Sequence, residues 1–337
     1  MTYTTIIKNG NVHDGEKFLG EKDVLIEEDK IVDIGKFNDV TADKVIDATS
    51  MVVSPGFIDV QNMTYELGNL DGNEGLNLTS QGVTSVVIGN CGNSGILDDK
   101  KAFVYRLDYL RKIKLGINVG MLVGHNSLRK FVLGSGERPA TQDEIILMST
   151  ILDEALSAGA LGLSSGLMYS PGLFADREEL ILLTSILRKY NRTYATHMRD
   201  EGDTLEEAVL EALDTTARSN SRLLISHFKV TGKQNRGKSI RCVNLIEQRR
   251  RNQEVFIDYY PYSATSTVLS IILLPEFLTK INGDLKKLEF NLEDEKIIEK
   301  TGKQNLCPSS WNDIKVVRSN VSNIVGKSIF EVAKEKK

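Results

Sequence analysis

Three side chains in this sequence are of types that bind transition metals, and they occupy equivalent positions. Cys91, His197 and His227 each stand at the end of a short run typical of a β-strand, where a polar stretch begins. The chain has only four histidines in 337 residues, so two at such positions, with a cysteine at a third, indicate a shared role. A thiolate and two neutral imidazoles suit a catalytic zinc ion, which usually has three protein ligands and one water molecule. The pattern therefore predicts a Zn²⁺ site that activates water for hydrolysis.

Each of these residues has a more ordinary interpretation when it is taken alone. A buried free cysteine or a hydrogen-bonded histidine is the commoner case in globular proteins. Their joint placement at three strand ends favours metal ligation. His125, in Gly124-His125-Asn126, is interpreted differently, because we expect it to form a hydrogen bond within the loop after its strand.

The elements that must position these residues follow a regular pattern from residue 52 onward. Strand-like apolar runs alternate with amphipathic helical stretches such as residues 143–158 and 205–218, as parallel β-strands joined by helices do. In such a barrel the functional groups gather at the carboxyl ends of the strands. The fold class is therefore predicted to be α/β, a TIM-like (β/α)8 barrel with about seven of its eight strands. The runs cover residues 52–60, 84–89, 117–124, 161–164, 193–197, 223–227 and 255–259.

The ends of the chain have a different character. Runs at residues 5–8, 23–27 and 30–35 alternate apolar and polar residues between close turns, which predicts a small β-meander. We expect three regions: a small β portion (1–54), the barrel (55–270), and a helical insertion or interrupted barrel end (271–337). The sequence stops where an eighth strand is expected, so we expect the barrel to be truncated.

The net charge, the cysteine content and the apolar runs of the chain limit the kinds of molecule that it is expected to bind and where it is expected to be found. A net charge of −4 and a pI near 5.8 predict no general attraction to nucleic acid or to an anionic membrane, which leaves a small-molecule substrate. Three scattered cysteines predict reduced thiols and a cytoplasmic protein. No apolar run approaches the roughly 20 residues that span a bilayer.

Five short motifs occur in order along the chain, and together they resemble one enzyme family. They are Pro-Gly-Phe-Ile-Asp (55–59), Gly-Asn-Cys-Gly (89–92), Gly-His-Asn-Ser-Leu-Arg (124–129), Gly-Leu-Met-Tyr (166–169) and His-Met-Arg-Asp-Glu-Gly (197–202). The sequence is similar to the N-acyl-D-amino-acid deacylases, or D-aminoacylases, of the amidohydrolase superfamily. The Asn-Cys-Gly and Thr-His-Met-Arg-Asp-Glu elements are the most specific, since the whole superfamily shares Pro-Gly-Phe-Ile-Asp.

The resemblance implies a zinc ion held by Cys91, His197 and His227 in a barrel flanked by a small β-sandwich. It implies hydrolysis of the amide bond of N-acyl-D-amino acids, which releases a D-amino acid and a carboxylate. Lys229 and Tyr169 match family residues that hold the substrate carboxylate, and Tyr262 matches a pocket-lining tyrosine. A solvated lysine at the barrel rim and tyrosines that only pack there are the alternatives for these three residues.

Two departures from the family pattern leave a second interpretation open. The superfamily's His-x-His after the first strand reads Gln61-Asn62-Met63 here, and the Ser-Asp-Gly element with the catalytic aspartate does not occur in the sequence. The chain could therefore be a non-catalytic, degenerate homologue that keeps only the metal site. Asp200, Glu201 and Asp258 are acids near the predicted site, but sequence alone does not place their carboxylates. Asp59 is expected to orient a neighbouring side chain.

Overall fold

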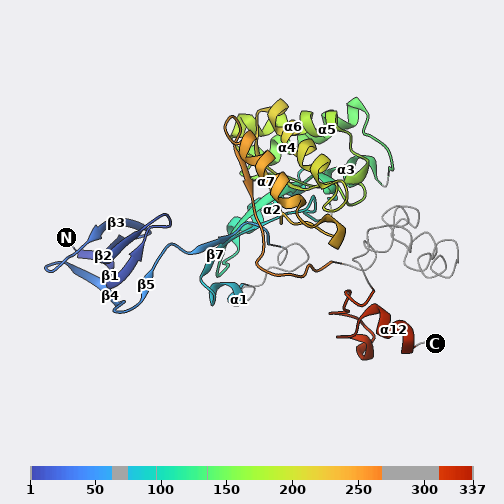
Figure 1. Cartoon of the computed structure of the whole chain (residues 1–337). Helices are drawn as coiled ribbons and strands as arrows, with labels where there is room; N and C mark the ends of the chain where they lie inside the picture. Colours follow the sequence, from blue (N-terminus) through green and yellow to red (C-terminus); the bar gives the residue numbers. More distant parts are fainter. Residues whose placement is uncertain (1, 63–74, 96, 135, 268–310, 336–337) are drawn as a thin grey trace. The chain divides into compact units, whose positions relative to one another are not determined.

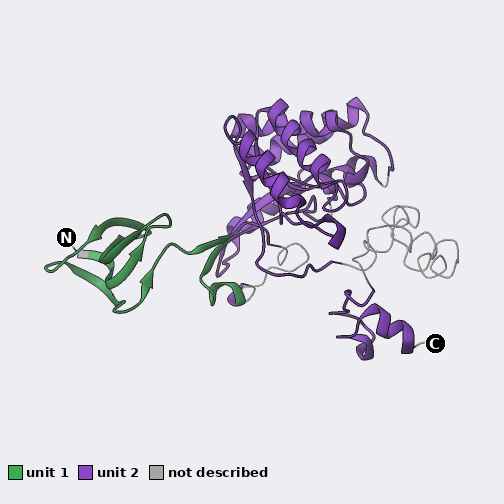
Figure 2. Ribbon diagram, viewed as in Figure 1, with its two compact units in different colours: residues 1–58, 77–85 green, residues 59–76, 86–337 purple. Residues whose placement is uncertain are grey.

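The computed structural model describes residues 2–62, 75–95, 97–134, 136–267 and 311–335 (Figure 1). The chain divides into two compact units, residues 1–58 with 77–85 and residues 59–76 with 86–337 (Figure 2). The predicted helical insertion that starts at residue 271 lies mostly outside the described residues. The strands of the described residues belong to two sheets, one of five strands and one of seven.

The N-terminal strands form a mixed five-stranded sheet. Strands β1 (Thr2–His13), β2 (Phe18–Glu27) and β3 (Lys30–Gly35) pair antiparallel in sequence order, which matches the predicted meander. Strands β4 (Thr41–Asp47) and β5 (Val52–Val53) add to β1 in parallel, and β4 was not foreseen as a strand. Ile6, Val24 and Leu25 are buried, so alternation along β1 and β2 produces one apolar face. The described residues of this region form a single sheet rather than the two layers of a sandwich.

The second sheet carries the residues of chemical interest. Its order is β12-β11-β10-β9-β8-β7-β6, so the spatial order of the strands equals their order along the chain. The four strand pairs from β8 to β12 are parallel, as in a TIM barrel. The result is the predicted seven-stranded partial barrel. The strands are β6 (Phe57–Asp59), β7 (Val83–Ile88), β8 (Asn118–Gly124), β9 (Gly162–Gly166), β10 (Thr193–His197), β11 (Arg222–Ile225) and β12 (Val255–Ile257).

Helices alternate with these strands and pack on each other beside the sheet (Figure 1). Helix α4 shows why they begin and end where they do: Thr141 and Glu144 form a reciprocal capping box at its start. Gly159, with φ of +109°, turns the chain after its end. No helix among the described residues is long and apolar enough to cross a membrane. The helices of the described segments are α1 (Leu76–Thr79), α2 (Ala102–Lys112), α3 (His125–Leu133), α4 (Gln142–Ser157), α5 (Arg177–Leu187), α6 (Leu205–Ser219), α7 (Lys238–Arg249) and α12 (Ile329–Glu335).

Candidate metal centre

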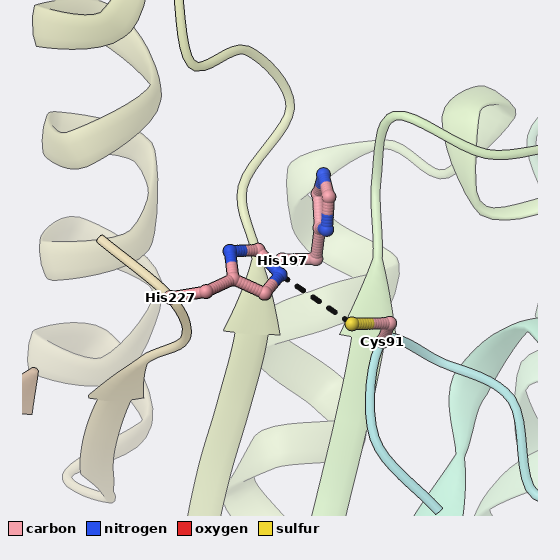
Figure 3. Close-up of side chains that lie close together, drawn as sticks. All are labelled: Cys91, His197 and His227. Atoms are coloured by element: carbon pink, nitrogen blue, oxygen red, sulfur yellow. Dashed lines mark hydrogen bonds between the residues drawn. The ribbon is translucent and has the colours of Figure 1, made fainter. Parts of the chain in front are cut away.

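Cys91, His197 and His227 converge at the carboxyl ends of three barrel strands (Figure 3). His197 is the last residue of β10, His227 lies two residues beyond β11, and Cys91 lies three residues beyond β7. One ligand atom from each residue lies within 4.8 Å of the other two, and Sγ of Cys91 is 3.5 Å from Nε2 of His227. The structure therefore brings together the three residues that the sequence singled out, here called the Cys-His-His cluster.

Two members of this cluster have unusual backbone conformations. Cys91 has φ of +52° and His227 has φ of +38°, a region that residues other than glycine seldom occupy. Such conformations cost on the order of 1–3 kcal/mol each and persist only where surrounding contacts enforce them. Asp258, directly after β12, enforces the one at His227, because its Oδ1 accepts a 2.6 Å hydrogen bond from the His227 N–H. These two conformations lower the stability of the fold, and they direct the side chains of Cys91 and His227 toward one another.

The loop that carries Cys91 is fixed by neighbours on two other elements. The N–H of Gly92 donates to Oγ of Ser164 on β9 at 3.0 Å, and the Gly92 carbonyl accepts from the N–H of Ser127 on α3 at 3.1 Å. Gly92 has φ of +76°, and a Cβ there would collide with the side chain of Asn126. The close approach explains why glycine follows Cys91.

Two features show whether the cluster fits a metal ion: the types of its ligand atoms, and a buried nitrogen of His197 that has no hydrogen-bond partner within the described residues. Nε2 of His197 is buried and has no hydrogen-bond partner within the described residues, while its Nδ1 lies 3.1 Å from the hydroxyl of Tyr169. A buried imidazole nitrogen without a partner costs free energy unless something occupies its lone pair. With Nδ1 protonated and donating to Tyr169, Nε2 offers that lone pair to a cation. A thiolate and two imidazoles match the ligand set that zinc prefers, so the residues fit the ion.

The second nitrogen of His227 is held by charged side chains. Nδ1 lies 3.0 Å from Oε1 of Glu201 and 3.0 Å from Nζ of Lys229, and these two partners are themselves 2.5 Å apart. A carboxylate behind a metal-binding histidine is a common arrangement that fixes the ring and its tautomer. Glu201 follows His197 by four residues in the same loop, and this partnership was not anticipated from the sequence.

Burial and charge set the protonation states around the cluster. Burial lowers the pKa of His197 to about 3, so its ring is neutral at pH 7, as a metal ligand must be. Burial opposes ionisation of Glu201, but the hydrogen bond from His227 and the neighbouring charges of His197 and Lys229 prevail and lower its pKa to about 2. Burial raises the pKa of Asp258.

The predicted substrate-binding residues have different surroundings. The Tyr169 ring lies 4.6 Å from the His197 ring, and burial raises the pKa of its phenol, so the group is a neutral donor beside the cluster. Lys229 lies beside the cluster too, in contact with Glu201. Tyr262 is 75% exposed and stacks on Tyr260, whose ring centre lies 5.8 Å from Nζ of Lys229. Tyr260 is therefore the tyrosine of this segment that approaches Lys229.

Gln61 takes a position next to the cysteine. Its Nε2 lies 3.2 Å from Sγ of Cys91, while its Oε1 is buried without a hydrogen-bond partner among the described residues. Asp59 orients this segment as expected, because it accepts from the Gln61 N–H at 3.1 Å and from Nδ2 of Asn62 at 2.7 Å. Met63 lies outside the described residues.

His125 is not part of the Cys-His-His cluster and instead contacts a buried carboxylate. It is the first residue of α3, and its Nε2 lies 2.7 Å from Oε1 of Glu179 on α5, which also pairs with Arg129. All three side chains are completely buried. The predicted hydrogen bond is present, but its partner comes from a helix rather than from the loop after the strand.

Asn126, the next residue, links three segments around the cluster and was also missed as a positioning residue. Its Nδ2 donates to the carbonyls of Gly166 and Tyr169 at 3.0 and 3.1 Å, and its Oδ1 accepts from the Gly166 N–H at 3.1 Å. The amide thereby ties α3 to the end of β9 and to the turn that carries Tyr169.

The chain is similar to known proteins over most of its length. The chain is 35% identical over 288 residues to a D-aminoacylase of Alcaligenes xylosoxydans xylosoxydans, which covers 79% of this chain and 59% of the relative. It is 36% identical over 269 residues to an N-acyl-D-aspartate deacylase of the same organism, covering 74% of this chain and 54% of that protein. The chain thus spans little more than half the length of these relatives. No family model matches the chain.

Solved structures show the same likeness in three dimensions. A D-aminoacylase crystal structure superposes with a TM-score of 0.69 at 35% identity, covering 77% of this chain and 59% of that one. An N-acyl-D-glutamate deacylase from Bordetella bronchiseptica, solved with zinc and a phosphonate inhibitor, superposes with a TM-score of 0.80 at 28% identity, covering 100% of this chain and 68% of that one. An L-hydantoinase, at 17% identity and a TM-score of 0.54, shares the fold alone. The chain has the fold of the amidohydrolase class. Within that class, the chain belongs to the D-aminoacylase family.

Proposed function

We propose that this chain carries the zinc site of an N-acyl-D-amino-acid deacylase, which hydrolyses the amide bond and releases a D-amino acid and a carboxylate. The observation that carries the proposal is the convergence of one thiol and two imidazoles within 4.8 Å at the carboxyl ends of β7, β10 and β11. Relatives named as deacylases of N-acyl-D-aspartate and N-acyl-D-glutamate support this substrate class.

Cys91, His197 and His227 would hold the ion. A zinc ion bound there would supply Lewis acidity, which polarises an amide carbonyl and lowers the pKa of coordinated water to about 7. The chain's own contribution is to hold one sulfur and two imidazole nitrogens close together, because Tyr169 and Glu201 fix the outer nitrogens of the two histidines.

Lys229 and Tyr169 would orient the substrate through its carboxylate. An ammonium and a phenol beside the cluster can each donate a hydrogen bond to that group, and a charge-assisted bond from lysine is the stronger of the two. Nζ of Lys229 lies 2.5 Å from Oε1 of Glu201 and donates to the His227 carbonyl at 3.1 Å, so with Nδ1 of His227 protonated the third N–H of the ammonium would donate to a substrate carboxylate. Tyr262 would contribute as a wall of the pocket at most, since three quarters of its surface is exposed.

A specific observation favours a second candidate function, a degenerate homologue that binds metal without hydrolysis. Gln61 contacts Cys91 where the family resemblance places a histidine, and a carboxamide is a weak ligand for zinc. The sequence also contains no Ser-Asp-Gly element to supply the family's proton-transferring aspartate. General acid–base catalysis is worth roughly 10²- to 10⁴-fold in rate, so its loss would leave a poor catalyst.

One paired measurement separates the two candidates. Zinc content of the purified chain is determined by elemental analysis, and amino acid release is followed from N-acetyl-D-methionine and N-acetyl-L-methionine. Near-equimolar zinc with D-selective release supports the deacylase, whereas zinc without release supports the degenerate homologue. The Cys91→Ser variant should lose zinc and the Cys242→Ser variant should retain it, because Cys242 is buried in α7, away from the cluster. A wild-type chain that binds no zinc contradicts both candidates.

A further inference from the structure

A hollow lies at the ends of β10 and β11 opposite to the Cys-His-His cluster. It has a volume of about 550 Å³ and lies where α5, α6 and α7 end and β10, β11 and β12 begin. Small-molecule sites commonly have volumes of about 300–1,000 Å³, so the hollow is large enough for a ligand. We call it the basic pocket. It is lined by Arg188, Asn191, Arg192, Thr216, Ala217, Asn220, Ser221, Arg222, Gln248, Arg249, Arg250, Arg251, Asn252, Gln253 and Glu254.

The charge of this lining is strongly one-sided. Six arginines and a single glutamate surround the pocket, although the whole chain carries a net charge of −4. Concentrated positive charge in a concave surface raises the local concentration of anions. The lining of the pocket is therefore more positive than the chain as a whole, which favours a negatively charged ligand.

Half of these arginines already have carboxylate partners. Arg222 pairs with Glu254 at 2.6 Å, Arg249 pairs with Asp214 at 3.1 Å, and Arg250 pairs with Glu247 at 2.9 Å. These pairs hold their side chains in place around the pocket.

The other three have no carboxylate within 4.0 Å anywhere in the described part of the chain. They are Arg188, Arg192 and Arg251. The Nε atom of Arg192 is buried, so an anion in the pocket would reach this arginine through its terminal Nη atoms.

Helix capping does not account for these arginines. The ends of the helices at this pocket use backbone donors: the N–H of Asn220 bonds to the Thr216 carbonyl after α6, and the N–H of Arg250 bonds to the Ile246 carbonyl after α7. Asn191, after the short 3-10 turn Arg188–Tyr190 that follows α5, does the same with the Arg188 carbonyl. The guanidinium groups of Arg188, Arg192 and Arg251 thus remain available to a ligand.

We infer that the basic pocket binds a polyphosphate anion, supplied as inorganic triphosphate or as the phosphate chain of a nucleotide. A guanidinium group recognises phosphate through two parallel N–H···O bonds, and successive phosphates can engage several arginines at once. A single carboxylate would satisfy only one of the three unpaired arginines, whereas a triphosphate offers acceptors to all of them.

This site is separate from the Cys-His-His cluster. Arg192 immediately precedes β10 and His197 ends it, so the five residues of that strand separate the two sites by about 15 Å. Ligand binding at the pocket can therefore be measured without zinc and without any substrate of the proposed deacylase.

The test is calorimetric titration of the full chain with inorganic triphosphate, with ATP and citrate as separate titrants. We expect saturable binding of one triphosphate per chain and at least tenfold weaker binding of citrate. ATP tighter than triphosphate would identify a nucleotide as the source of the phosphates, and equal affinities would identify the phosphate chain alone.

The double variant Arg188→Gln/Arg251→Gln removes two exposed arginines of the pocket without touching its buried floor, so folding should be preserved. We expect triphosphate binding to weaken at least tenfold. The matched control is Arg218→Gln/Arg241→Gln, which removes two arginines on α6 and α7 that pair with Glu178 and Glu206 outside the pocket. Equal affinity in both double variants, or no wild-type binding at 1 mM triphosphate, overturns the inference. So does binding of duplex RNA with the same arginine dependence when triphosphate does not bind.

Discussion

The carboxylate of Glu201 and the Nδ1 atom of His227 lie 3.0 Å apart, and Nζ of Lys229 lies at the same distance from that nitrogen. The two contacts require different tautomers. If Nδ1 carries the proton, it donates to Glu201 and leaves the Nε2 lone pair directed toward Cys91. If Nδ1 is unprotonated, it accepts from Lys229 and Nε2 carries the proton, which blocks metal binding. Glu201 therefore favours the tautomer that can bind a metal.

The first prediction concerns the tautomer of His227. In Glu201→Gln the carboxylate charge is lost and Lys229 competes more strongly for Nδ1, so we expect zinc affinity to fall by about 10- to 100-fold. Lys229→Met should leave zinc affinity unchanged or tighter, because the competing donor is removed. Both are measured by competition with a chromophoric chelator. The exposed Glu207→Gln on α6 is the control, and an equal loss in that variant would point to a general charge effect.

The second prediction concerns the departure at Gln61 and Met63. The double variant Gln61→His/Met63→His introduces the His-x-His of the family resemblance, and Gln61 is already adjacent to Cys91. We expect zinc stoichiometry to rise from one toward two ions per chain in titrations followed by elemental analysis. Gln61→Asn/Met63→Leu changes the same positions without adding imidazoles and should stay at one. A stoichiometry of one in the histidine variant would argue against a second position here.

The sequence was sufficient to predict the barrel strands and the cluster. The apolar runs ending at His197 and near His227 have strand periodicity, and parallel strands place their carboxyl ends on one rim, so the ligand types could be matched to positions. The roles of Glu201 and Asn126 escaped prediction because Glu201 lies in a loop and Asn126, at the start of α3, contacts the turn after β9, and no periodicity encodes such contacts. Strand β4 was missed because its alternating pattern is weak: only Ala42 of its seven residues is partly buried.

The positions of the tyrosines near Lys229 could not be predicted for the same reason. Tyr260 and Tyr262 share one face by the alternation of an extended segment, and sequence could not show which of them approaches Lys229. His125 illustrates the reverse case. Its hydrogen bond was expected, but the partner Glu179 lies 54 residues away and is brought near only by packing of α3 beside the segment that leads into α5.

The third prediction tests Asn126 as a positioning residue. Asn126→Ala removes three hydrogen bonds. The Gly166 and Tyr169 carbonyls keep the N–H groups of Tyr169 and Leu173 as donors, so the main loss is the acceptor of the Gly166 N–H, at a cost of roughly 1–3 kcal/mol where that group is buried. We expect the free energy of unfolding to fall by about 1–3 kcal/mol in urea titrations. Zinc affinity should fall as well, because Tyr169 positions the His197 ring. Tyr169→Phe separates the effects, since it should weaken zinc binding with little loss of stability.

The fourth prediction concerns the buried group around Glu179. This carboxylate pairs with Arg129 and His125, and all three side chains are fully buried. Burial opposes its ionisation, but the hydrogen bonds and charges of His125 and Arg129 lower its pKa. Glu179→Gln would leave the Arg129 charge uncompensated, at a cost of about 3–5 kcal/mol. The neighbouring Glu178→Gln breaks only the exposed pair with Arg218 and should cost less than about 1 kcal/mol, as thermal and urea unfolding can establish.

The last prediction is a pH dependence of stability at the start of α4. The hydrogen bond from Arg138, together with the Thr141 N–H, lowers the pKa of Glu144 from 4.5 to about 2. Because the folded pKa lies below the unfolded value, the stabilisation is fully present above about pH 4.5 and is lost as the pH falls through about 2.

Glu144→Gln should therefore destabilise the chain by about 0.5–1 kcal/mol at pH 6, a modest amount because the pair is largely solvated. The difference from wild type should shrink as unfolding is measured at successively lower pH between 4.5 and 2. Glu154→Gln lies on the exposed side of the same helix and should show no such convergence. A wild-type advantage that stays constant down to pH 2.5 would mean that the Arg138 contact does not form in solution.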